Sequence, residues 1–197
     1  MLEKSFYQRE DPVQIAHDLI GKVLVTHFNE ELTKGIIVET EAYKAPEDRA
    51  CHAHLNKFSK RTEVMFREGG CAYIYLCYGM HHLFNVVTGK EGQAHAVLVR
   101  ALEPLEGKDF MEERRGNPKD KYRVTKGPGS LSKAMGITKE LTGHMLTQED
   151  SEIWIEEPVQ NKKYDIQTSA RIGIDYAKEW KDVPWRFYVR GNKYVSG

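Results

Sequence analysis

Apolar and polar residues alternate along several stretches of the chain, and a period of two is typical of β-strands with one buried face. These stretches are rich in β-branched and aromatic residues and are bounded by Gly, Asn or charged residues. Each is therefore interpreted as a strand. The predicted strands are 22–28, 35–43, 71–77, 83–87, 94–101, 152–156 and 185–190.

Two helices are predicted among these strands. Asp11 followed by Pro12 indicates a helix start, because Asp caps the first amides and Pro suits the first helical position; Gly21 ends that helix. A second helix, capped by Ser130 or its neighbours, stops at Gly136. Since the helices do not alternate strictly with strands, the pattern favours an α+β fold, with helices flanking a curved, largely antiparallel β-sheet. The apolar positions of the second helix are Leu131, Ala134 and Met135.

A chain of 197 residues can bury one continuous core, so we expect a compact single domain that spans 1–197. No stretch approaches the ~18 apolar residues of a membrane span, and the first residues lack the basic and apolar regions of a signal peptide. Cys51, Cys71 and Cys77 cannot all pair with one another. We therefore expect a cytoplasmic protein of the bacterial type that has no membrane contact.

The run 35–43 carries carboxylates within a strand. Its period of two places Glu39, Glu41 and Tyr43 on one face with Ile37. A solvated outer face would explain the two carboxylates as well as a functional face would. Taken alone, this strand favours the solvated face.

The neighbouring strands change that interpretation. Tyr73 and Tyr75 share one face of their strand, and Arg100 is the charged residue inside an apolar run, so it needs either solvent or an anionic partner. A pocket with Glu41 as its floor, Tyr43 and Tyr75 as its walls and Arg100 beside them would satisfy all three strands at once.

Motifs for other chemistries lack their standard spacing. Lys126 begins a glycine-containing stretch that does not have the spacing of a phosphate-binding loop, and there is no nucleophile elbow. The possible metal ligands show no zinc-site pattern, so we expect no metal. These ligands are Cys51, His52, His54, Cys71, Cys77, His81 and His82.

Several sequence blocks, in order, resemble the alkyladenine (3-methyladenine) DNA glycosylase family over nearly the whole chain. Together they form a specific set, although each block alone is short. They differ from the family in the loop 53–61 and at Phe84, which affects the shape of the pocket wall. The matching blocks are 18–22, 38–43, 46–48, 50–52, 65–66, 73–75, 78–80, 85, 99–106, 127–131, 171–173 and 185–190.

The resemblance implies a compact domain on a curved antiparallel sheet that flips damaged purines, alkylated or deaminated, out of duplex DNA. Glu41 would be the general base, while Arg100 and the main-chain carbonyl of Ile172 would help to hold the attacking water. Tyr78, with Met80 beside it, would be the wedge that replaces the flipped nucleotide. The residues implied to form the base pocket are Tyr43, His52, Tyr75 and Asn85.

This chemistry suits the residue types. A carboxylate near C1′ can orient water and stabilise an oxocarbenium-like sugar, and an alkylated purine is already activated to leave. No Lys lies in the three motif strands near Glu41, so we expect water as nucleophile and no lyase step. Neither metal nor organic cofactor is implied, and no obligate protein partner.

The charge balance limits how such a protein could bind DNA. With 29 basic and 29 acidic residues, binding must come from local patches. The segments 57–67 and 114–126 are basic, and although charge alone favours solvated loops, they become candidates for phosphate contacts beside a lesion. The predicted backbone contacts are Arg61, Arg114, Arg115 and Lys126.

A competing interpretation is a non-enzymatic nucleic-acid-binding module, or a substrate-binding domain of a formyl-transferring enzyme, with a similar barrel. Such a module has no need of a buried carboxylate. Convergence of Glu41 and Arg100 in one concave pocket would therefore distinguish the enzyme from the module.

Overall fold

Eight strands form one sheet in the computed structural model, which describes residues 1–160 and 162–197. Every strand pairing in this part of the chain is antiparallel. The strand order is β3-β4-β5-β2-β1-β6, and β8 pairs with both β2 and β7. The strands are β1 (Val23–Phe28), β2 (Glu31–Lys44), β3 (Ala72–Cys77), β4 (His81–Thr88), β5 (His95–Glu106), β6 (Ile153–Glu156), β7 (Ile166–Ser169) and β8 (Arg186–Val189).

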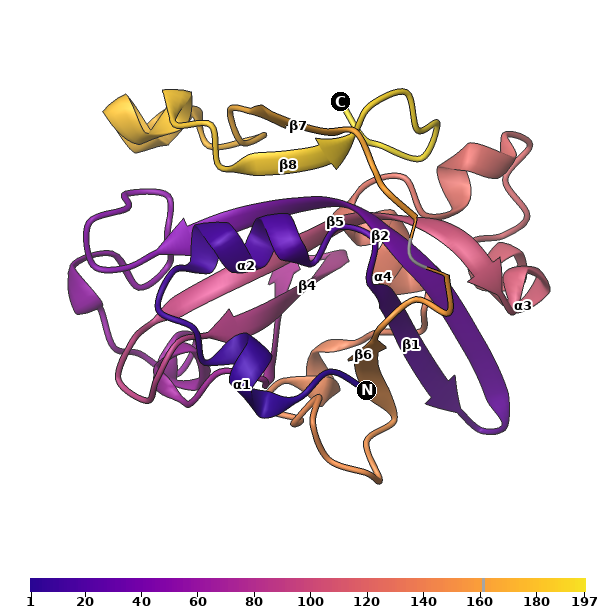
Figure 1. Cartoon of the computed structure of the whole chain (residues 1–197), viewed down its shortest axis with the longest axis horizontal. Helices are drawn as coiled ribbons and strands as arrows, with labels where there is room; N and C mark the ends of the chain where they lie inside the picture. The colour runs from indigo at the N-terminus through magenta and orange to yellow at the C-terminus, as the bar shows by residue number, and fades with distance from the viewer. Residues whose placement is uncertain (161) are drawn as a thin grey trace.

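Strands β2 and β5 cross the middle of the molecule as its two longest strands, with β7 and β8 along one side (Figure 1). Their register shifts on both sides of Glu39, which marks a bulge in β2. Beyond the bulge Glu41 lies opposite Leu98 on β5 and opposite Arg186 on β8. A bulge bends a strand and re-aims its side chains. In this protein the bulge lies at Glu39, two residues before Glu41.

Short helices flank the sheet. The Asp11 side chain accepts a hydrogen bond from the Val13 amide at 3.1 Å, which confirms the predicted cap, but the helix ends at Asp18, before Gly21. The second predicted helix begins at Pro128, so Ser130 lies inside it and is not its cap. The α-helices are α1 (Lys4–Tyr7), α2 (Pro12–Asp18), α3 (Lys108–Arg114) and α4 (Pro128–Ala134), and the 3-10 helices are η1 (His54–Asn56), η2 (Glu63–Phe66), η3 (Lys121–Val124), η4 (Lys139–Leu141) and η5 (Asp175–Asp182).

The buried residues form a main core, a smaller cluster and a third group of Ala50, Ile174 and Ala177. The main core packs α2 and α4 against the sheet, with Ile37, Phe84 and Leu102 among its fully buried side chains. The smaller cluster includes Cys51 and Met65 and supports the aromatic residues of β3.

All three cysteines are free thiols. None of the helices described is long and apolar enough to cross a membrane. The α+β class and the antiparallel sheet are thus confirmed.

Candidate active site

A cavity of about 410 Å³ opens beside β2, β3, β4 and β5. Its walls are largely aromatic, and polar groups come from both long strands and from the segment that precedes η5. A concave, partly apolar pocket with a few convergent polar groups is the usual form of a ligand site. The predicted site residues among those that line it are Tyr43, His52, Arg61, Tyr75, Tyr78, Asn85, Arg100 and Ile172.

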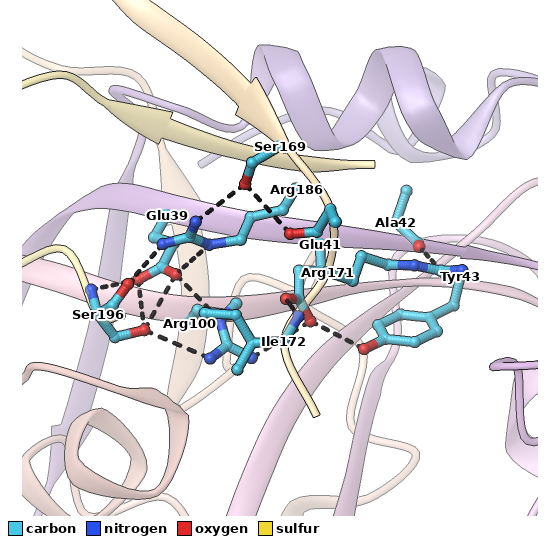
Figure 2. A network of polar contacts seen from close by, with 11 residues as sticks. Glu39, Glu41, Ala42, Tyr43, Arg100, Ser169, Arg171, Ile172, Arg186 and Ser196 are labelled. Atoms are coloured by element: carbon cyan, nitrogen blue, oxygen red, sulfur yellow. Dashed lines mark hydrogen bonds and ion pairs between the residues drawn. The ribbon is translucent and has the colours of Figure 1, made fainter. Parts of the chain in front are cut away.

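Glu41 lies fully buried directly behind this cavity, held by three donors (Figure 2). Its Oε1 accepts the Ile172 amide at 2.7 Å; its Oε2 accepts the Tyr43 hydroxyl at 2.8 Å and Arg100 Nη1 at 3.2 Å. A carboxylate offers about four acceptor positions. One position, on Oε1, is therefore left for a further donor.

Arg100 has the anionic partner that its place in an apolar run required. Arg100 is 7% exposed, and its guanidinium bonds to Glu39 as well as to Glu41. Burial lowers the pKa of Arg100, but the two carboxylates more than offset this and leave that pKa raised. Since both carboxylates are fully buried, the interpretation of β2 as a solvated face is wrong.

Ile172 contributes a group other than the one implied. The resemblance assigned its carbonyl to the water, whereas the structure shows its amide bonded to Glu41. The role of the carbonyl stays a prediction. The preceding residue, Arg171, forms a fully buried ion pair with Asp48, in which Nη2 lies 2.8 Å from Oδ1. Arg171 also donates to the Ala42 carbonyl at 2.8 Å, so this pair ties the segment of Ile172 to β2.

Tyr43 is stacked from behind by that same cation. The Arg171 Cζ lies 4.8 Å from the centre of the Tyr43 ring. Burial, together with the negative charge of Glu41, raises the pKa of Tyr43 well above its usual value. Tyr43 therefore stays protonated and can donate to Glu41. Arg171 and Asp48 had no role assigned from the sequence, although both lie in blocks that match the family. Since 123 residues separate them, no local pattern shows that they pair.

His52 forms the opposite wall with Tyr75. Their rings meet edge to face with centres 4.6 Å apart. Arg61 Nη2 lies 3.0 Å from His52 Nε2, and because a guanidinium can only donate, Nε2 accepts and Nδ1 carries the proton toward the Tyr73 hydroxyl, 2.8 Å away. Burial, then the charge of Arg61, lowers the pKa of His52 to about 4. His52 is thus neutral at pH 7.

Asn85 lies deep in the pocket, 3% exposed, on β4. Its amide donates to the carbonyls of Tyr73 and Leu83, both at 3.1 Å. These bonds fix the orientation of the side chain against the base of the two aromatic strands.

Tyr78 and Met80 project from the turn between β3 and β4. Tyr78 is 89% exposed and Met80 is 70% exposed. The Met80 amide donates to the Cys77 carbonyl at 3.2 Å, and both central residues, Tyr78 and Gly79, have positive φ. This turn holds two large side chains in solvent, and of the two Tyr78 lines the pocket.

The predicted backbone contacts have different surroundings. Arg61 lines the pocket and lies over the Tyr75 ring, 4.9 Å from its centre. Arg114 is engaged internally, donating to the Ala134 carbonyl and to Glu31. Arg115 likewise holds the Val124 carbonyl and the Ser130 hydroxyl.

Lys126 is exposed and borders a surface hollow with Lys119 and Arg123.

The part of the chain that the structure describes has no group of three or more His, Cys, Asp or Glu side chains arranged to hold a metal ion.

The fold and the pocket define the class: an α+β protein whose aromatic pocket ends on a buried, hydrogen-bonded carboxylate, as in an enzyme active site. The chain belongs to the methylpurine-DNA glycosylase (MPG) family, whose sequence profile matches residues 5–193. It is therefore a DNA glycosylase, an enzyme that acts on N-glycosyl bonds.

Relatives match along their whole length. A protein of Chlamydia abortus named "Putative 3-methyladenine DNA glycosylase" is 47% identical over 192 residues, covering 96% of this chain and 98% of its own. A protein of Natranaerobius thermophilus with the same name is 46% identical over 196 residues, covering 99% and 98%. One of Clostridium botulinum is 42% identical over 203 residues.

Proposed function

We propose that the protein releases 3-methyladenine-type alkylated purines and deaminated purines from double-stranded DNA by water attack on the N-glycosidic bond, leaving an abasic site. One observation carries this proposal. Glu41 is buried, is held by three donors and keeps one acceptor position free behind an aromatic pocket. The names of the relatives support the alkylated lesion, 3-methyladenine.

The base would enter the pocket after rotating out of the duplex. Tyr43 then lies on one side, and His52 with Tyr75 on the other. A cationic alkylated purine gains cation–π attraction there, about 0.5 to 2 kcal/mol per good contact, which a neutral normal base does not. Since His52 is neutral at pH 7, it does not repel such a base.

In the reaction, the bond between C1′ and the purine nitrogen breaks, and its electron pair leaves with the base. An alkylated purine carries a positive charge and so leaves as a neutral molecule, whereas a neutral deaminated purine must take up a proton, from water or a pocket group, to leave in the same way. Water bound to the free position of Glu41 adds to C1′ and passes a proton to the carboxylate. Arg100, Tyr43 and the Ile172 amide hold Glu41 in place and compensate its charge. No lysine is among the described residues that line the cavity, which supports a monofunctional enzyme without a covalent step.

The alternative of a non-enzymatic nucleic-acid-binding module is less well supported. A binding module has no need of a buried carboxylate, so the absence of one beside Arg100 would have favoured it over an enzyme. Here Glu41 and Arg100 are in contact next to one cavity, and a module that contacts anionic phosphate gains nothing from that pair.

The direct experiment is incubation of the protein with methylated duplex DNA, followed by chromatographic identification of the released base. We expect 3-methyladenine in the supernatant and alkali-sensitive abasic sites in the DNA. Strand cleavage without alkali would contradict the monofunctional mechanism, and absence of any released base would contradict the proposed activity.

A further inference from the structure

Glu39 shares the buried face of β2 with Glu41, and neither carboxylate is among the residues that line the cavity. All three donors of Glu41 belong to lining residues, whereas Arg100 is the one partner of Glu39 that lines the cavity. Its Oε1 accepts Arg100 Nε at 3.0 Å and Arg186 Nε at 2.7 Å. The Ser196 amide donates to Oε2 at 2.7 Å, and the Ser196 hydroxyl lies 3.0 Å and 2.8 Å from the two oxygens. The acceptor positions of Glu39 are therefore filled, and it has none left for water.

These contacts fix the plane of the Arg100 guanidinium. Arg100 gives Nε to Glu39 and Nη2 to the Ser196 hydroxyl at 3.3 Å, so only Nη1 reaches Glu41. A guanidinium that is free to turn prefers two parallel hydrogen bonds to one carboxylate. The bonds to Glu39 and Ser196 oppose that arrangement, which would occupy a second position on Glu41.

Arg186 completes the network from β8. Besides Glu39, it binds the Ser196 carbonyl and the Ser169 hydroxyl, the latter at 2.9 Å (Figure 2). The cluster thus balances two carboxylates against two guanidinium groups, all 8% exposed or less. Removal of the Glu39 charge would leave Glu41 as the only carboxylate beside both cations.

We propose that Glu39, Ser196 and Arg186 are positioning residues, which hold Arg100 to a single hydrogen bond with Glu41 and so keep the remaining carboxylate position open for the attacking water. This inference rests on the proposed function. It assigns to Glu39 a role distinct from that of a base, although Glu39 and Glu41 lie on the same face of the same strand.

The test is the rate of base release in a single turnover, measured against pH. In Glu39→Gln we expect the rate to fall roughly 10- to 100-fold, because the water is misplaced. We also expect the acid limb of the profile to move to lower pH, because the two guanidinium groups of the cluster then face one carboxylate in place of two. Affinity for lesion-containing duplex should change less than about twofold, since none of these groups lines the pocket. The other titratable or charged groups that face Glu41 are Tyr43, Tyr75, Arg100 and Arg171.

Ser196→Ala provides a second variant that keeps both carboxylates and removes only the hydroxyl. We expect a smaller shift of the acid limb in the same direction, because Arg100 Nη2 loses the Ser196 hydroxyl as its partner and can turn toward Glu41. Ser132→Ala is the matched control: Ser132 is a fully buried serine of α4 whose hydroxyl has no partner among the described residues, and neither rate nor limb should change.

A rate loss with an unmoved acid limb in both variants would overturn the inference, because a purely structural role weakens the site without changing its titration. If Glu39→Gln does not fold, Ser196→Ala decides alone. Absence of base release by the wild type would instead overturn the proposed function, and this inference with it.

Discussion

His52 shows how burial prepares a residue for its place in the pocket. Its ring lies between Tyr75, Arg61 and the Tyr73 hydroxyl, and its pKa is lowered to about 4. A neutral imidazole accepts from Arg61 and presents no charge to an incoming cationic base. The same burial has a measurable effect on stability.

Between pH 6.5 and 4 the unfolded chain binds a proton at His52 that the folded chain does not, so stability falls as the pH is lowered through this window. From pH 7 to pH 5 the loss attributable to His52 is about 2 kcal/mol. Urea unfolding of the wild type and of His52→Gln at both pH values checks this. The variant should lose less stability on acidification; an equal loss would show that His52 is not buried neutral. Burial also lowers the pKa of His95. His95 is present in both proteins, so its effect on stability cancels in the comparison.

At the scale of elements, the turn between β3 and β4 is under strain where the proposed wedge stands. Tyr78 has a φ of 51°, a left-handed conformation that costs a residue with a side chain roughly 1 to 2 kcal/mol, and that Asn tolerates better. Such strain is commonly retained at functional sites. A tyrosine in this conformation that is 89% exposed supports a role in contact with a partner outside the folded chain.

Tyr78→Asn should therefore stabilise the turn while removing the wedge. We expect the melting temperature to stay the same or rise. Base release should fall much more from duplex than from single-stranded DNA, where no gap in a stack has to be filled. Parallel single-turnover assays on both substrates give the comparison. Equal losses on the two substrates would indicate a role in the pocket and not in flipping.

The elements that the sequence predicts correctly are those with a local signal. Strands β1 to β5 show alternation, and α2 has its Asp-Pro start. Strand β5 extends past the predicted end at residue 101 to Glu106 despite Pro104, because Pro104 lies at a register shift opposite Gly35, where a missing amide is tolerated. Strand β7 has four residues and pairs, among the described strands, with β8 alone. A segment this short has too few positions for a period of two to be recognised in the sequence.

The same limit applies to the candidate site. That Glu41 and Tyr43 share a face follows from a period of two. The donors that distinguish Glu41 from Glu39 come from Ile172 and Ser196, which are 131 and 157 residues away. Such long-range hydrogen bonds form when β8 pairs with β2. They cannot be predicted from the residues next to each partner in the sequence.

At the scale of the whole molecule, zero formal net charge means that DNA binding depends on where the cations lie. Arg114 and Arg115 hold internal carbonyls. Although Arg115 also borders the hollow around Lys126, both are therefore poorer candidates for phosphate contacts than the exposed cations of that hollow.

Ser130 lines that hollow. The neighbouring residue of α4, Gly129, packs closely against His81, which follows the wedge turn at the start of β4. We expect the duplex to pass over both the hollow and the wedge turn.

Replacing Arg123 and Lys126 with Ala should weaken binding to damaged and undamaged duplex alike. The slope of log affinity against log salt should become less steep by about 0.9 for each phosphate that the protein no longer neutralises. A salt titration with both duplexes measures it. The matched control replaces Lys162 and Lys163, exposed residues between β6 and β7 that border neither cavity nor hollow. Weaker binding to the lesion duplex alone would place the hollow in base recognition.

The central claim, that Glu41 activates the water, is tested most directly by single-turnover base release from methylated duplex with Glu41→Gln. The amide keeps the shape of the carboxylate but cannot take a proton. We predict a rate at least roughly 1000-fold below the wild type, with lesion-duplex affinity nearly unchanged, while Glu47→Gln, an exposed glutamate six residues further on, releases base normally. Near wild-type release by Glu41→Gln would contradict the account.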